Sequence, residues 1–183
     1  MKKAIFVFMA VLAVFMLASC VTANAPAGGD VKLSDNWWDN PPADTKDVHY
    51  EVGYAEGSTL QISRDWAKAN VNTALAQYVS NTVDAIVTTY VNDAGEVSKQ
   101  GNNMQALQAF ESVSKQRAQA TLTGVTYKFQ SMPNGGVYVL ASLPIGPLAE
   151  EFKEQVKESF VKNAAAKEAN DMMNAAIDKY FSK

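Results

Sequence analysis

The chain has 183 residues, of which 48% are hydrophobic, and its formal net charge is −3. This mildly acidic balance argues against a nucleic-acid-binding protein and against electrostatic binding to anionic lipid. The single cysteine excludes an intramolecular disulfide, so packing has to stabilise the domain.

The N-terminus has the three-part layout of a secretory signal. Two lysines precede an unbroken apolar run of about fifteen residues, 4–18, whereas a membrane-spanning helix needs roughly twenty. Small residues then lead to Cys20, the only cysteine of the chain. We therefore expect a signal that is cleaved between Ser19 and Cys20.

The residues around that site, Leu-Ala-Ser-Cys at 17–20, resemble the lipobox of bacterial lipoproteins. The resemblance implies that the Cys20 thiol is diacylglycerated and that its new amino group is acylated, with palmitate as a typical chain. Each buried methylene contributes about 0.8 kcal/mol, so two or more chains anchor a protein firmly. The alternative is an ordinary secretory signal with an incidental cysteine.

Three segments follow from this interpretation: a signal peptide at 1–19, the lipidated cysteine with a flexible tether at 20–47, and a single α/β domain at 48–183. The mature chain has 183 − 19 = 164 residues, enough for one complete core. The tether contains Ala-Pro-Ala-Gly-Gly, several Asn and Asp residues and Pro41-Pro42, and it also carries Trp37 and Trp38. These two side chains are expected to pack back on the domain as an anchor; the alternative is an exposed partner contact.

The domain is predicted to begin with a strand, Val48 to Ala55, in which alternate residues share a face. Ser58 or Thr59 can cap the helix that follows, whose apolar residues recur at three- and four-residue steps from Trp66 to Val91. A weaker helical pattern runs through Met104, Leu107, Phe110, Val113, Ser114 and Ala118.

Two further strands are predicted at 122–130 and 137–143, because the period changes to two. Asn134-Gly135 between them is a strong hairpin signal. The last part of the chain has a helical pattern and is expected to form one helix or two. It begins with an apolar stripe at Leu148, Phe152, Val156 and Phe160. The alanine-rich tail that follows is expected to pack on its own sheet or to form a subunit interface. We predict an α+β fold: a small, mainly antiparallel three-stranded sheet packed against long helices, in the order strand-helix-helix-strand-strand-helix.

No set of residues predicts an enzyme, a metal site or a cofactor. His49, the only histidine, is expected to be a partly exposed strand residue. The acids from Glu150 to Glu158 are interleaved with lysines and indicate a solvated helix face. Two glycines at 53 and 57 lack the remainder of a phosphate-binding motif, and therefore indicate a strand that approaches a neighbour closely and then turns.

Several of these features together resemble the Lpp-twenty family of small Gram-negative lipoproteins, which is related to a flagellar outer-membrane lipoprotein. They are Cys20, the stretch from Trp37-Trp38 to Pro41-Pro42, the segment 50–57 and the alanine-spaced helix through Ala67 and Ala74. The resemblance implies a lipid-anchored α/β domain without recognised enzymatic activity. The residue after the cysteine is Val21, and in this position the chain resembles lipoproteins that are forwarded to the outer membrane.

The sequence therefore predicts a non-enzymatic lipoprotein of the outer membrane, facing the periplasm or the cell surface. Its partners are expected to be the membrane, through the lipid, and envelope proteins or other copies of itself, without nucleic acid. The alternatives are a periplasmic lipoprotein that binds a peptide or another small ligand, and an envelope enzyme that uses a pair of carboxylates in one cleft.

Overall fold

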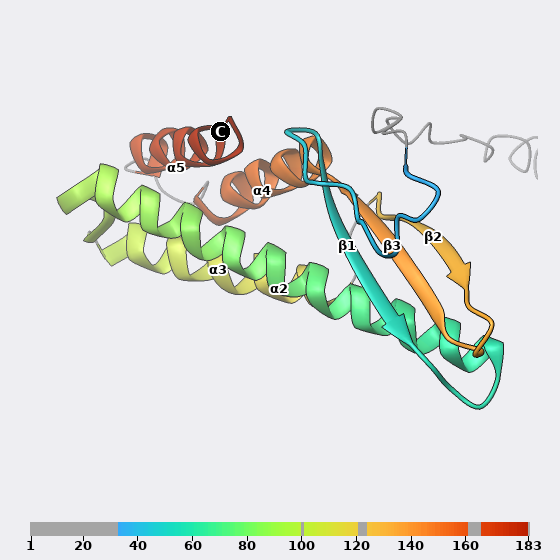
Figure 1. The fold of residues 1–183 in the computed structure, drawn as a ribbon. Helices are drawn as coiled ribbons and strands as arrows, with labels where there is room; N and C mark the ends of the chain where they lie inside the picture. Colours follow the sequence, from blue (N-terminus) through green and yellow to red (C-terminus); the bar gives the residue numbers. More distant parts are fainter. Residues whose placement is uncertain (1–32, 100, 121–123, 161–165, 183) are drawn as a thin grey trace, which may run out of the picture.

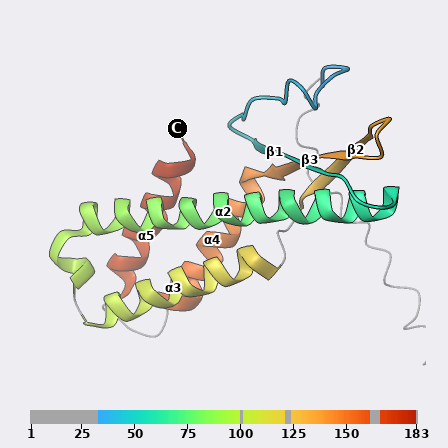
Figure 2. The same ribbon diagram turned by 60° about the horizontal axis from the view of Figure 1, so that its bottom comes forward.

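The structure, a computed structural model, describes residues 33–99, 101–120, 124–160 and 166–182. A three-stranded sheet lies over one end of the long helix α2 (Leu60–Ala94), and three further helices pack around its other end (Figures 1 and 2). The predicted α+β class and element order are confirmed. The closing helical segment is two helices, α4 (Ile145–Phe160) and α5 (Ala166–Phe181).

The sheet has the strand order β1-β3-β2, and both pairs are antiparallel. β1 is Val48–Ala55, β2 is Thr126–Ser131 and β3 is Val137–Pro144. The predicted hairpin joins β2 to β3: Gly135 has a φ of 85°, and Met132 N donates to Gly136 O at 2.8 Å. The positive φ explains why the turn contains Asn-Gly.

The face of β1 that packs on α2 has small residues toward the end of the strand, at Gly53 and Ala55. β3 contributes Val137, Val139, Ala141 and Leu143 to the core, and their partners across the β1 pair are Ala55, Gly53, Glu51 and His49. A Cβ at Gly53 would lie 2.7 Å from Ala67 O of α2. Glycine is needed there because the helix backbone passes so near, as the sequence predicted.

α2 begins at the predicted cap, where Thr59 Oγ1 accepts from Ile62 N at 3.3 Å, and ends at Gly95, which has a φ of 50°. The prediction of a buried apolar stripe is wrong at two positions, because Trp66 is 56% exposed and Val91 is 39% exposed. Ala67 is fully buried, and consecutive residues of a helix differ by about 100° in direction, so Trp66 projects beside the sheet instead of beneath it.

The helical half of the core lies between α2, α4, α5 and α3 (Gly101–Ala120), with the short 3-10 helix η2 (Gly95–Lys99) between α2 and α3. The predicted stripe of α4 is buried at all four positions, and Ser114 of α3 donates to Gln155 inside this core. Met104 of α3 was expected in the apolar pattern but is 44% exposed. α5 buries its apolar residues within the domain: Ala169, Met173, Ala176 and Ile177.

Residues 33–47 run across the face of the sheet opposite α2 (Figures 1 and 2). Trp37 is 2% exposed, and Leu140 of β3, which alternates with the core residues of that strand and so faces this side, is also 2% exposed. The packed part of the chain thus reaches back at least to Trp37, well before residue 48. In the described residues, no helix is long and apolar enough to span a membrane.

Candidate functional site

The only histidine lies in a cluster that joins three parts of the fold. His49 is 7% exposed, so the prediction of a partly exposed strand residue is wrong. Its ring stacks on Tyr78 of α2, with the centroids 3.5 Å apart and the planes 8° from parallel. Burial follows because α2 lies beneath β1 and the segment before β1 folds over its end.

Both ring nitrogens of His49 lie within hydrogen-bonding distance of a carboxylate. Nδ1 is 2.6 Å from Asp44 Oδ2, and Nε2 is 3.1 Å from Glu51 Oε1. Each ring nitrogen can donate to the carboxylate beside it when it carries a proton, and a neutral imidazole has one such N–H. Asp44 also accepts from Tyr50 N through its other oxygen, at 2.9 Å. The cluster therefore fixes the segment 33–47 to β1.

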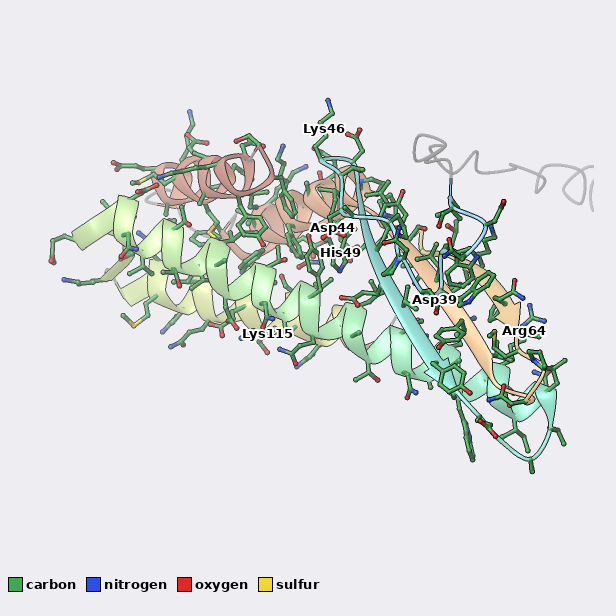
Figure 3. All side chains as sticks on the ribbon, in the orientation of Figure 1. Asp39, Asp44, Lys46, His49, Arg64 and Lys115 are labelled. Carbon is green, nitrogen blue, oxygen red and sulfur yellow. The ribbon has the colours of Figure 1, made fainter. Side chains whose placement is uncertain are left out.

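A small pocket of about 290 Å³ opens beside this cluster, and its walls come from the N-terminal segment, β1, α2, α4 and α5. Burial raises the pKa of Tyr78 to about 12, and the neighbouring Tyr180 adds to this effect. The Tyr180 hydroxyl lies 3.3 Å from Thr82 Oγ1. In Figure 3 the Asp44 side chain points toward His49, whereas Lys46 points away from the molecule. The lining residues are Asp44, Thr45, Lys46, His49, Tyr78, Ile145, Tyr180 and Phe181.

This cluster does not have the geometry of a metal site. The two carboxylates bind opposite nitrogens of one ring, so their oxygens do not converge on a common point. In the described ranges, no group of three or more histidine, cysteine or acidic residues is arranged to hold a metal ion. What the cluster can do chemically is hold the strand, the helix and the N-terminal segment together.

A second region of interest lies around the opposite end of β1 and the start of α2. Three large apolar side chains are exposed there: Trp66 at 56%, Leu60 at 53% and Tyr54 at 37%. The backbone beneath them is well fixed, since Ser63 Oγ donates to Gly135 O at 2.7 Å and Asn134 Nδ2 donates to the Tyr54 hydroxyl at 3.1 Å. Exposed aromatic groups on a firmly held surface are typical of contact sites.

The site residues predicted from the sequence are not among the residues of either region. Ser19 and Cys20, the cleavage and lipidation positions, lie outside the described residues. Trp37 is buried, as the anchoring interpretation expects, so its ring offers almost no surface to a partner in this conformation. Trp38 is half-buried, and its ring packs edge-on against Trp37 with the centroids 5.9 Å apart. Neither tryptophan lines the pocket beside His49.

Sequence reasoning missed Asp44 as the partner of His49, and it missed the exposure of Trp66.

The acids of α4 form ion pairs with the interleaved lysines, as the solvated-face interpretation expects. Two of these pairs are spaced i,i+3: Glu150 with Lys153 at 3.3 Å and Glu154 with Lys157 at 3.7 Å. Lys153 also reaches Asp178 of α5 at 2.8 Å, which makes this face partly structural.

No protein-family model matches the chain, and no curated protein and no solved structure is significantly similar to it. The resemblance to the Lpp-twenty family therefore stays a prediction from the sequence motifs.

Proposed function

We propose that the protein is a lipid-anchored lipoprotein of the outer membrane, facing the periplasm or the cell surface, whose domain acts as a non-enzymatic protein-interaction module. The signal-like N-terminus with Cys20 supports the anchor. The observation that carries the interaction role is the exposure of three large apolar side chains near the end of β1 and the start of α2: Tyr54, Leu60 and Trp66. A surface of this kind is stabilised when a partner covers it.

Photocrosslinking in the intact envelope tests the interaction role. A benzophenone amino acid in place of Trp66 is expected to crosslink to one or a few defined envelope proteins. The matched control carries the same group in place of Met104, which is exposed to a similar degree but lies on α3. Equal crosslinking patterns from the two positions would refute the proposed surface.

The anchor has its own test. In the variant Cys20→Ala, we expect loss of metabolic labelling by radioactive palmitate and loss of the protein from the membrane fraction. The control is Val21→Ala, which keeps the cysteine. If the Cys20→Ala protein stays with the membrane as tightly as the wild type, the lipid-anchor assignment is wrong.

A second candidate function, the binding of a small ligand, is favoured by the pocket beside His49. Its volume of about 290 Å³ is close to the lower end of the usual range for ligand pockets, and its walls include the half-buried rings of Tyr180 and Phe181. Nuclear magnetic resonance with short cell-wall peptides as probes tests it. Binding predicts shifts around Tyr78 and Tyr180 that are lost in Tyr180→Ser; an unchanged spectrum rejects this alternative.

A further inference from the structure

β1 is an edge strand, and part of its outer edge is unpaired. Its neighbour in the sheet is β3, and on the other side Tyr50 N donates to Asp44 Oδ1 while Tyr54 O accepts from Asn70 Nδ2 at 3.0 Å. Backbone groups of alternate strand residues point to the same side, so those of Val52 also point outward. Within the described residues, the N–H and C=O of Val52 have no hydrogen-bond partner.

The two ends of this edge are closed by hydrogen bonds to residues outside the sheet. At the start of β1, Thr45 N donates to Val48 O at 2.9 Å, and Val48 N donates to Thr45 Oγ1 at 3.0 Å. At the other end Asn70 covers the Tyr54 carbonyl. Among the residues that the structure describes, the groups left without a partner are therefore the Tyr50 carbonyl, both groups of Val52 and the Tyr54 N–H, enough to pair with a short segment of an added strand.

The free backbone groups of β1 form an opening in the edge of the sheet. Beside this opening, α2 presents a row of exposed side chains that we call the shelf. The shelf consists of Trp66, Asn70, Thr73 and Gln77, which are spaced four, three and four residues apart and are all exposed. Asn70 fixes its position next to β1, because its amide reaches the strand. A strand added to the edge of β1 would thus lie along the shelf, with one of its side chains against the Trp66 ring.

The charges around the opening are negative. Asp44 lies at one end of it and Glu56 at the other, and Glu56 Oε2 accepts from two uncharged donors, the Tyr54 hydroxyl at 3.1 Å and Asn134 Nδ2 at 3.0 Å. Asp65 precedes Trp66, and the shelf itself carries no lysine or arginine. Lys46 points away from the opening (Figure 3). An occupant with positive side chains complements this surface, and a cation over the Trp66 ring adds to the attraction.

We propose that the open edge of β1 binds an extended, lysine- or arginine-bearing segment of a partner protein as an added strand, with the shelf of α2 beneath it. This inference rests on the proposed interaction role and names the manner of binding and the chemistry of the partner. A second copy of the chain is a less suitable occupant, because its own edge carries the same negative groups.

The test uses the purified lipidated protein in uncharged detergent and a fluorescent peptide, Lys-Val-Lys-Val-Lys-Val, as the probe. Two modified peptides carry N-methyl groups on the valines or on the lysines. A strand presents the N–H groups of alternate residues to one edge, so we expect one modified peptide to bind at least about tenfold more weakly and the other to bind almost as well as the probe. Glu-Val-Glu-Val-Glu-Val is expected not to bind.

Trp66→Ser is expected to weaken binding of the probe about fivefold to tenfold, whereas Met104→Ser leaves it unchanged. If both methylated peptides, or neither, lose affinity, strand addition is wrong. Light scattering provides a further outcome: a dimer that Trp66→Ser dissolves, without binding of the probe, would identify a second copy as the occupant and overturn the proposal. Crosslinks from position 66 that persist in the envelope while the probe fails would leave the interaction role intact.

Discussion

The two edges of the sheet are protected in different ways. At the β2 edge, α2 places the Arg64 guanidinium 3.8 Å above the Phe129 ring and the Lys68 ammonium 4.5 Å from the Tyr127 ring. At the β1 edge the same helix contributes Asn70 to a single carbonyl. Cations beside an edge strand discourage pairing with another chain, so α2 guards the β2 edge with positive charge and contributes an uncharged side chain at the β1 edge.

The largest effect is expected from His49→Ala, which tests how firmly the start of β1 is closed. The change removes hydrogen bonds to two carboxylates and the stack on Tyr78, so we expect a loss of about 2–4 kcal/mol in the free energy of unfolding. Urea unfolding measures it, and limited proteolysis within residues 33–47 should accelerate. Thr126→Ala, at an exposed position of β2, serves as the control and should change stability by less than about 0.5 kcal/mol.

The next effect concerns the close approach of β1 to α2. Gly53→Ala adds a methyl group 2.7 Å from Ala67 O, so strand and helix must separate, and we expect a cost of about 1–3 kcal/mol. Gly146→Ala is the matched control, because its methyl group would meet no atom within 4 Å and the position lies in α4. Equal unfolding midpoints for the two variants would contradict the packing described here.

Tyr78, which lies beneath the His49 ring of β1, makes the stability of the protein sensitive to alkaline pH. Its pKa is raised to about 12 in the folded protein by burial, against 10.0 for the free group. The unfolded chain loses the proton first, so the stabilisation is complete below about pH 10 and is lost as the pH rises toward 12. We expect a decline on the order of 1–2 kcal/mol across this window. In Tyr78→Phe the decline should be smaller; an identical decline would contradict the assignment to Tyr78.

The smallest effect is expected at the β2 edge. Arg64→Gln removes a partly hydrated cation from the Phe129 ring, and about 0.5–1 kcal/mol should be lost. Arg64→Lys is the control because it keeps the charge, and it should retain part of the interaction. If the Gln and Lys variants are equally stable, the cation at this position contributes nothing to stability.

The fold could be predicted because its elements have clear periods. The hairpin follows from Asn134-Gly135 between two alternating segments, and the buried face of α4 follows from a four-residue repeat of Leu, Phe and Val. Gly53 was also predictable, since two glycines between a strand and a helix indicate close approach. These features are local, and neighbouring residues decide them.

The candidate site was less predictable because its contacts join distant or irregular segments. Asp44 lies in a stretch without periodicity, and nothing in the sequence pairs it with His49 or brings Tyr78 beneath that ring. Trp66 falls within an apolar pattern of three- and four-residue steps that a helix alone cannot divide into buried and exposed sides. In the structure, the sheet covers the face of the helix that carries Ala67 and leaves Trp66 exposed.

The length of α2 has a mechanical consequence. With 35 residues it extends for about 50 Å, and it packs against β1 and β3 at one end and against α3 and α5 at the other. An unbroken helix of this kind behaves as a stiff rod, so a bend in it disturbs both of its packed ends. The sheet and the helical core are therefore expected to unfold together in one cooperative step rather than separately.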